Sequence, residues 1–189
     1  VGSRCVIANG AALAGHVTVH DGVIIGGLCG IHQFVKLGSV AMIGAGAMVA
    51  QDIPPYCMAQ GDRASIQGLN RVGLERNGGS RDDLAVLREV YRLIFTPAGT
   101  EAQGKVFKDR VAQARELVGS NERGLAFVSF IEGSQRGIAP HHRGVSSAEC
   151  IREKAGSRGL LGRYLSEIVS KLGALDEFHK RRRYRAKDG

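Results

Sequence analysis

The sequence predicts a parallel β-helix of hexapeptide repeats followed by a small helical domain. Two observations lead to this fold class. First, residues 1–54 divide into nine rows of six without a gap, and the first residue of every row is aliphatic. Second, the fifth residue of every row is apolar and mostly small. Apolar residues recur every 3.6 positions in a helix and every two in a strand, so a strict period of six indicates stacked coils of short strands.

The two apolar positions predict what fills the coils. Nine rows make three coils, which should stack at about 4.8 Å. Aliphatic first-position side chains should fill the corners, namely Val1, Ile7, Leu13, Val19, Ile25, Ile31, Leu37, Ile43 and Val49. The fifth-position side chains suit a narrow interior and are Cys5, Ala11, Val17, Val23, Cys29, Val35, Ala41, Ala47 and Ile53. Eighteen pattern positions without a break disfavour a β-sandwich with coincidental spacing.

Small turn-forming residues recur near the expected corners. We expect them to permit positive φ where the backbone turns. They are Asn9, Gly10, Gly15, Gly22, Gly26, Gly27, Gly38, Gly44 and Gly46.

We expect the β-helix to occupy residues 1–56. It should end at Pro54 and Pro55, because proline cannot donate to a strand ladder. A loop should follow from residue 57 to 76, as the start of a second domain at 57–138. Residues 139–189 are rich in Lys and Arg, and we expect a basic extension there, either helical or disordered.

The second domain carries three helical patterns. Ser80 with Asp83 three residues later is typical of a helix N-terminus. An apolar face follows at Leu84, Leu87, Val90, Tyr91 and Ile94. A second helix is expected over 101–117, with apolar residues Val106, Phe107, Val111, Ala114 and Leu117, and a third over 125–131.

Charge and cysteine usage narrow the class of protein. The net charge is +8, and all of the excess lies after residue 60. Such an excess attracts phosphates, acidic proteins or nucleic acid. The four cysteines form no CxxC pair, so we expect reduced thiols and a cytoplasmic protein. No signal peptide or membrane-spanning apolar run occurs, and because the first residue is Val the chain can start inside a longer protein.

Three histidines occur in the repeat at positions that should face outward: His16, His20 and His32. His16 and His32 are 16 residues apart, which places them on adjacent coils near the same edge. No Cys or carboxylate joins them at ligand spacing, so we expect no metal and no cofactor. His20, beside Asp21, is interpreted as a solvated surface residue.

Several segments together closely resemble the UDP-N-acetylglucosamine O-acyltransferases of lipid A biosynthesis. The resemblance covers residues 1 to about 138 and leaves the last 50 unmatched. The segments are 13–17 (LAGHV), 25–27 (IGG), 32–34 (HQF), 50–56 (AQDIPPY), 59–64 (AQGDRA), 68–70 (GLN) and 73–74 (GL). Their order and spacing are far more specific than hexapeptide repeats alone.

The resemblance implies a left-handed β-helix that assembles as a homotrimer with active sites between subunits. It implies transfer of a 3-hydroxyacyl chain from acyl carrier protein to the 3-hydroxyl of UDP-N-acetylglucosamine. The family's general base, a histidine, would fall four residues before Val1, so we expect the 189 residues alone to be nearly inactive. By the same matches, Gly15 offers a backbone N–H as oxyanion donor, His16 and His32 lie in the cleft, and Gln33 contacts substrate.

Some residues depart from the pattern of that family. Arg63 stands where relatives have a nucleotide-contacting histidine, and an arginine can also grip a diphosphate. Arg76 matches the first of an arginine pair, and Asn77 replaces the second. The position that sets acyl-chain length, often glycine, is Ala45 here.

Three other functions stay open on the sequence alone. A related amino-sugar N-acyltransferase shares the β-helix but is not expected to carry both AQDIPPY and GLN. A non-catalytic trimeric scaffold would explain the absence of the base. A nucleic-acid binder could use the basic run at 180–185, but only Tyr184 interleaves it and stacking platforms need more aromatics.

Overall fold

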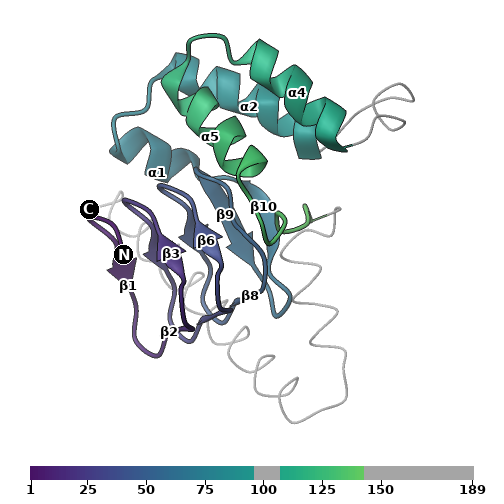
Figure 1. The fold of residues 1–189 in the computed structure, drawn as a ribbon. Helices are drawn as coiled ribbons and strands as arrows, with labels where there is room; N and C mark the ends of the chain where they lie inside the picture. The colour runs from purple at the N-terminus through teal and green to yellow at the C-terminus, as the bar shows by residue number, and fades with distance from the viewer. Residues whose placement is uncertain (96–106, 143–189) are drawn as a thin grey trace, which may run out of the picture. The chain divides into compact units, whose positions relative to one another are not determined.

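The computed structural model describes residues 1–95 and 107–142, which form a three-sided β-helix with helices packed at one end (Figure 1). The first face consists of β1 (Val6–Ile7), β4 (Ile24–Ile25), β7 (Met42–Ile43), β9 (Cys57–Gln60) and β10 (Ser65–Leu69). The second face consists of β2 (Ala12–Leu13), β5 (Gly30–Ile31) and β8 (Met48–Val49), and the third of β3 (Thr18–Val19) and β6 (Lys36–Leu37).

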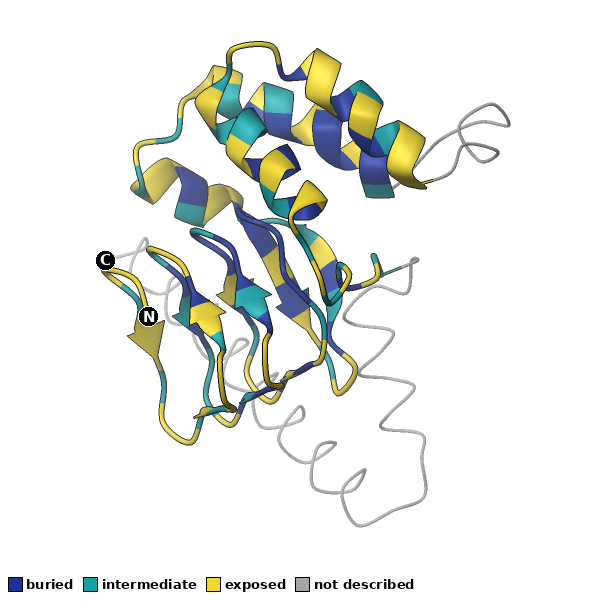
Figure 2. Ribbon diagram, in the orientation of Figure 1, coloured by how far each residue is buried: buried dark blue, intermediate teal, exposed yellow. Residues whose placement is uncertain are grey.

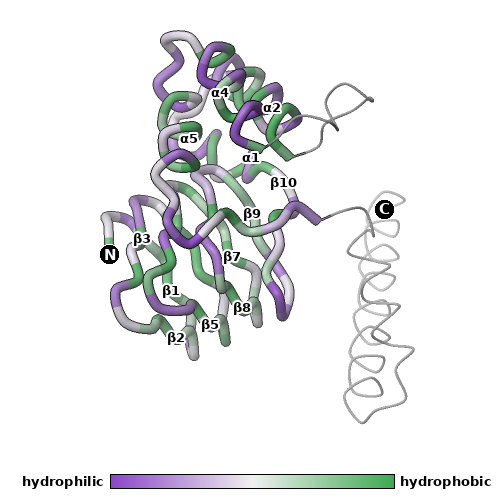
Figure 3. The backbone as a smooth tube through the Cα atoms, turned by 45° about the vertical axis from the view of Figure 1, so that its right-hand side comes forward, coloured by the Kyte–Doolittle hydropathy of each residue, from purple (hydrophilic) through white to green (hydrophobic). Residues whose placement is uncertain are grey.

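The register of the strands confirms the predicted parallel β-helix. Ile7 pairs with Ile25 and Ile25 with Ile43, each 18 residues further along the chain. From Val19 to Val49 every first-position side chain is buried, as is every fifth-position side chain from Val23 onward. The green of hydrophobic residues recurs along successive strands of the β-helix in Figure 3. The period of six therefore arises from one inward-pointing set of side chains repeated on three faces.

The corners differ from the expectation in their choice of residues. Of the nine small residues expected there, only Gly10, Gly22 and Gly46 have positive φ. Positive φ instead marks the fourth position of every row up to residue 46, whatever its side chain, so Arg4, His16, Leu28, Phe34 and Val40 also adopt it. At several of these corners the fourth-position N–H donates to a third-position carbonyl of the preceding coil. Stacking thus imposes a conformation that costs a residue with a side chain about 1–2 kcal/mol.

The expected end of the β-helix at Pro54 and Pro55 is wrong. The chain continues into β9, which pairs in parallel with β7. The last coil has 16 residues instead of 18, because Leu37 lies beside Ile53 and Met42 beside Met58. Ile53 therefore takes a first-position place instead of the expected fifth. The prolines lie at a corner, where the ladder needs no N–H donor.

The expected loop over residues 57–76 is also wrong, because β9, β10 and α1 (Arg71–Arg76) occupy it. β10 folds back antiparallel on β9. Asn70 begins α1: its side-chain oxygen accepts from Gly73 N–H, and its side-chain amide donates to the Val40 carbonyl 2.9 Å away. The expected boundary at residue 56 thus falls inside the β-helix.

The three longer helices lie together in Figure 1, and Figure 2 shows dark blue buried residues along the sides that face one another. They are α2 (Arg81–Phe95), α4 (Phe107–Leu117) and α5 (Glu122–Glu132). The apolar face predicted for α2 is buried throughout. In α4, Phe107 and Leu117 are exposed, contrary to the expectation. The expected start of this second helix at 101 and the extension from residue 143 onward lie outside the described residues.

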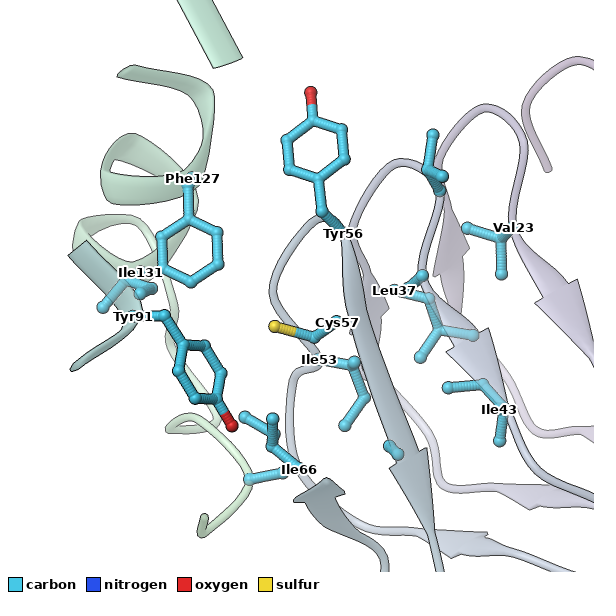
Figure 4. Packing of buried hydrophobic residues seen from close by; sticks show 14 of the residues in the cluster. Val23, Leu37, Ile43, Ile53, Tyr56, Cys57, Ile66, Tyr91, Phe127 and Ile131 are labelled. Atoms are coloured by element: carbon cyan, nitrogen blue, oxygen red, sulfur yellow. The ribbon is translucent and has the colours of Figure 1, made fainter. Parts of the chain in front are cut away.

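The third helix begins earlier than expected, at Glu122, because Asn121 caps it. The Asn121 side-chain oxygen accepts from Gly124 N–H at 2.8 Å. A continuous core joins the helices to the β-helix: Phe127, Ile131 and Tyr91 approach Cys57, Ile53 and Ile66 in Figure 4. Burial raises the pKa of both the Cys57 thiol and the Tyr91 phenol, so these groups stay protonated.

Residues 134–142, here termed the strap, return from α5 to the β-helix. Ile138 pairs in parallel with Asp52, and His141 pairs with Ile66. Asp52 is 1% exposed. Its carboxylate accepts from Lys36 N–H at 2.8 Å and from the Ser134 hydroxyl at 2.7 Å. A buried carboxylate needs such partners, so Asp52 fixes the strap to the last coil.

Asp83 connects two helix N-termini. The Ser80 N–H donates to the Asp83 carboxylate at 2.9 Å, and the Asp83 N–H donates to the Ser80 hydroxyl at 3.0 Å, which confirms the predicted capping pair. The Asn121 amide donates to the same carboxylate at 2.8 Å, and Arg123 lies 3.2 Å from it. These donors, the Ser80 N–H first, lower the pKa of Asp83.

We predict that Asp83→Ala lowers the free energy of unfolding by about 1 kcal/mol, which is typical for loss of a helix cap. Because the pKa of Asp83 is lowered in the folded chain, its contribution is present above about pH 4 and is lost as the pH falls through the folded pKa. Urea unfolding followed by circular dichroism at neutral and acidic pH measures both effects. Asp82→Ala, in the same exposed first turn, is the control; equal effects of the two variants would contradict the prediction.

Candidate functional site

A groove of about 710 Å³ runs over the second face of the β-helix. Its floor is made by outward-facing residues of β2, β5 and β8, and its upper end by the loop between β9 and β10 and by the strap. The lining residues are Ala12, Leu13, Ala14, Gly30, Ile31, His32, Met48, Val49, Ala50, Gln51, Asp62, Arg63, Ala64 and Pro140. The floor is apolar and built from small side chains, whereas polar groups lie at His32, Gln51, Asp62 and Arg63.

Gly15 borders this groove at the corner that follows β2, directly after the lining residue Ala14. Its carbonyl accepts from Phe34 N–H at 3.1 Å, whereas its own N–H has no acceptor within the described residues. No atom lies within 4 Å of the place where a Cβ on Gly15 would be. The Gly15 amide is therefore open to a ligand, as an oxyanion donor must be.

His16 lies exposed at the same corner with φ 58°. Its ring stacks on that of Phe34, one coil further on, with centroids 5.0 Å apart and planes inclined by 5°. Phe34 also has positive φ, at 64°. The two rings lie parallel because equivalent corners of adjacent coils direct their side chains the same way.

His32 lines the groove, and Gln33 follows it at the border. The His32 Nδ1 atom is 3.3 Å from the Gln33 carbonyl, which can only accept a hydrogen bond. In the neutral ring Nδ1 therefore carries the proton, and Nε2 keeps a lone pair. His32 is thus able to accept a proton or a hydrogen bond from a ligand through Nε2.

The structure brings Arg63 to the groove but not Arg76. Arg63 is exposed at the upper end, beside Asp62, whose carboxylate accepts from the Arg63 N–H at 3.1 Å. Arg76 is at the end of α1, next to Asn77, and Asn77 lies against the corner at Gly22. That corner joins the third and first faces, so Arg76 is on the other side of the coil from the groove.

Ala45 lies at the corner between β7 and β8 and is exposed, but it does not line the groove. It comes three residues before Met48, which does. Sequence reasoning missed Met48 and Pro140. The signal for Met48 was the sixth position of the row, which faces outward beside the buried first position. No sequence signal placed Pro140, because it reaches the groove from the far end of the described chain.

Other candidate groups lie elsewhere. His20 meets Phe130 of α5 edge to face, with centroids 6.0 Å apart, and so belongs to the junction with the helices. Within residues 1–95 and 107–142, no three His, Cys, Asp or Glu side chains come together as metal ligands would. Cys5, Cys29 and Cys57 are free thiols. None of the helices in these ranges has the length and apolar character needed to cross a membrane.

Comparison with known proteins assigns this architecture. Residues 52–139 match the family described as Udp N-acetylglucosamine O-acyltransferase, domain 2. The acyl-[acyl-carrier-protein]–UDP-N-acetylglucosamine O-acyltransferase of Aliarcobacter butzleri is 42% identical over 140 residues, which are 73% of this chain and 50% of that protein.

Solved structures agree with the sequence match. The UDP-N-acetylglucosamine acyltransferase of Arabidopsis superposes with a TM-score of 0.68 at 39% identity, over 73% of this chain and 49% of that one. That of Francisella novicida gives 0.69 at 29% identity, over 79% and 53%. The chain spans about half the length of the curated relatives that it matches.

A β-helix of hexapeptide repeats that is followed by helices and carries a groove on one face defines a class, the β-helical acyltransferases. Within that class, the matches over residues 52–139 and over about three quarters of the chain are specific. The chain belongs to the UDP-N-acetylglucosamine O-acyltransferase family.

Proposed function

We propose that this chain supplies the acyl groove and part of the active site of an acyl-[acyl-carrier-protein]–UDP-N-acetylglucosamine O-acyltransferase of lipid A biosynthesis. The observation that carries the proposal is the groove on the second face, which begins at the open N–H of Gly15 and ends at Arg63. Its small apolar floor suits an alkyl chain, and its polar ends suit the two groups that an acyl transfer joins.

The reaction transfers a 3-hydroxyacyl group from the thioester of acyl carrier protein to the sugar 3-hydroxyl. The hydroxyl oxygen attacks the thioester carbonyl, the carbon–sulfur bond breaks, and the proton leaves the hydroxyl for the departing thiol by way of a base. Negative charge develops on the carbonyl oxygen during the attack. An N–H with no other acceptor, as at Gly15, stabilises that charge because it needs no reorganisation.

The neighbouring residues have supporting roles in this proposal. His32 accepts a hydrogen bond through Nε2, while His16 and Gln33 lie at the border where the reacting groups meet. Arg63 offers a planar pair of donors to a diphosphate. We further propose a homotrimer of left-handed β-helices, in which Arg76 reaches the groove of a neighbouring copy, since it lies away from the groove of its own chain.

The proposal predicts transfer when a base is supplied. The resemblance places that base four residues before Val1, so the 189 residues alone should turn over slowly, by about 10²–10⁴-fold. A fusion in which further coils precede Val1, with a histidine at that place, should transfer the acyl group. The assay uses 3-hydroxyacyl-acyl carrier protein and UDP-N-acetylglucosamine, with product detected by mass. A folded fusion that forms no ester would contradict the proposed function.

A second prediction concerns Arg63. In the active fusion, Arg63→Ala should weaken binding by about 1.5–3 kcal/mol, the usual worth of a hydrogen bond to a charged group. A rise in KM for the nucleotide sugar indicates the diphosphate, and a rise for the acyl donor indicates phosphopantetheine or the acidic carrier. Arg88→Ala, an exposed arginine of α2, is the control. The assignment is wrong when both KM values stay the same.

A third prediction concerns Ala45 as the residue that limits acyl-chain length. Its methyl group should occupy space that glycine would leave to the alkyl chain, and each buried methylene is worth about 0.8 kcal/mol. Ala45→Gly should therefore move the optimum of kcat/KM toward longer 3-hydroxyacyl donors. Ala85→Gly, at an exposed position of α2, controls for general destabilisation. An unchanged optimum would show that residue 45 does not measure the chain.

A further inference from the structure

Met48 lies across the floor of the groove, on top of Gly30. The two residues are partners in the parallel register of β5 and β8, so their outward directions coincide. A Cβ at Gly30 would fall 2.6 Å from the Met48 sulfur and 3.6 Å from its methyl carbon. No carbon and sulfur atoms pack so closely, so the Met48 side chain can rest there only because residue 30 is glycine.

Met48 differs from the rest of the floor in size and freedom. Its neighbours among the outward-facing lining residues of the strands and their ends include Ala12, Ala14 and Ala50. Met48 is unbranched and 49% exposed, and a methionine with room around it changes rotamer readily. One long, flexible side chain therefore occupies a channel otherwise built from methyl groups and glycine.

We infer that Met48 limits the length of the alkyl chain that the groove accepts, in addition to any effect of Ala45. This inference rests on the proposed function, which runs the chain from Gly15 toward Ala45. Gly15 follows β2 on one edge of the second face, and Ala45 precedes β8 on the other edge, two coils further on. A path between these corners crosses the strand that carries Gly30, where the Met48 thioether lies.

The position of Met48 gives two distinct settings. While the thioether rests on Gly30, it fills floor that methylene groups would otherwise cover. When it swings out toward solvent, that floor opens. Each methylene covered or left uncovered changes affinity by about fourfold. The groove should therefore show a sharp chain-length preference that responds to residue 48 and to residue 30.

The first experiment reads binding without turnover. The sequence holds three methionines, Met42, Met48 and Met58. Met42 and Met58 lie on the first face, which makes them internal controls. With ¹³C-methyl methionine, the chain is titrated with 3-hydroxyacyl-pantetheine thioesters of increasing length. We expect the Met48 methyl resonance to shift once the chain is long enough to reach it, while the other two stay unchanged.

The second experiment compares Met48→Ala with Met42→Ala, an equally large truncation on another face. Met48→Ala should raise the affinity for chains longer than the wild-type optimum by about fourfold per added methylene. Gly30→Ala should displace the Met48 thioether and narrow the floor, which shifts the optimum to shorter chains. A Met48 resonance that no thioester moves, or a length profile of Met48→Ala equal to that of Met42→Ala, overturns the inference. Length-dependent binding without transfer in the fusion would instead contradict only the proposed function.

Discussion

The stacking of each coil on the preceding one in an 18-residue register is the constraint on which this structure depends. It pairs the backbone N–H and carbonyl groups of successive coils, as from Ile25 to Ile43. It also aligns every side chain with its equivalent one coil away. His16 stacks on Phe34 and Met48 covers Gly30 for this one reason. The groove is thus a ladder of equivalent positions, and a substitution changes it through the residue on the neighbouring rung.

The loss of two residues from the last coil turns the repeat into a site. It places Asp52, instead of an apolar side chain, inside the top of the β-helix. The desolvation cost of that carboxylate is offset by the N–H of Lys36 and the hydroxyl of Ser134. The strap held in this way brings Pro140 to the upper end of the groove, next to Arg63. A polar residue in the core therefore builds the wall at which the groove ends.

The sequence predicted those parts of the fold that depend on local or periodic constraints. The narrow interior admits one set of side chains, so period six was legible, and the Ser80–Asp83 cap depends on three intervening bonds of chain. The strands β9 and β10 escaped prediction because their pairing is set by distant partners, as Ile66 with His141 shows. Prolines at 54 and 55 suggested an end, since proline is unsuited to a ladder but acceptable at a corner.

The candidate site divides in the same way. His32 and Arg63 were placed correctly in the groove, but the separation of Arg76 from it depends on where α1 packs, which no local pattern encodes. A groove open along one side has one wall per chain. Leu28 and Phe34, 71% and 51% exposed, lie at the two corners that flank this face. Large apolar side chains at both edges of an open groove favour a second copy as the opposite wall, because its contact would cover them and bury an alkyl chain that one chain alone leaves half in water.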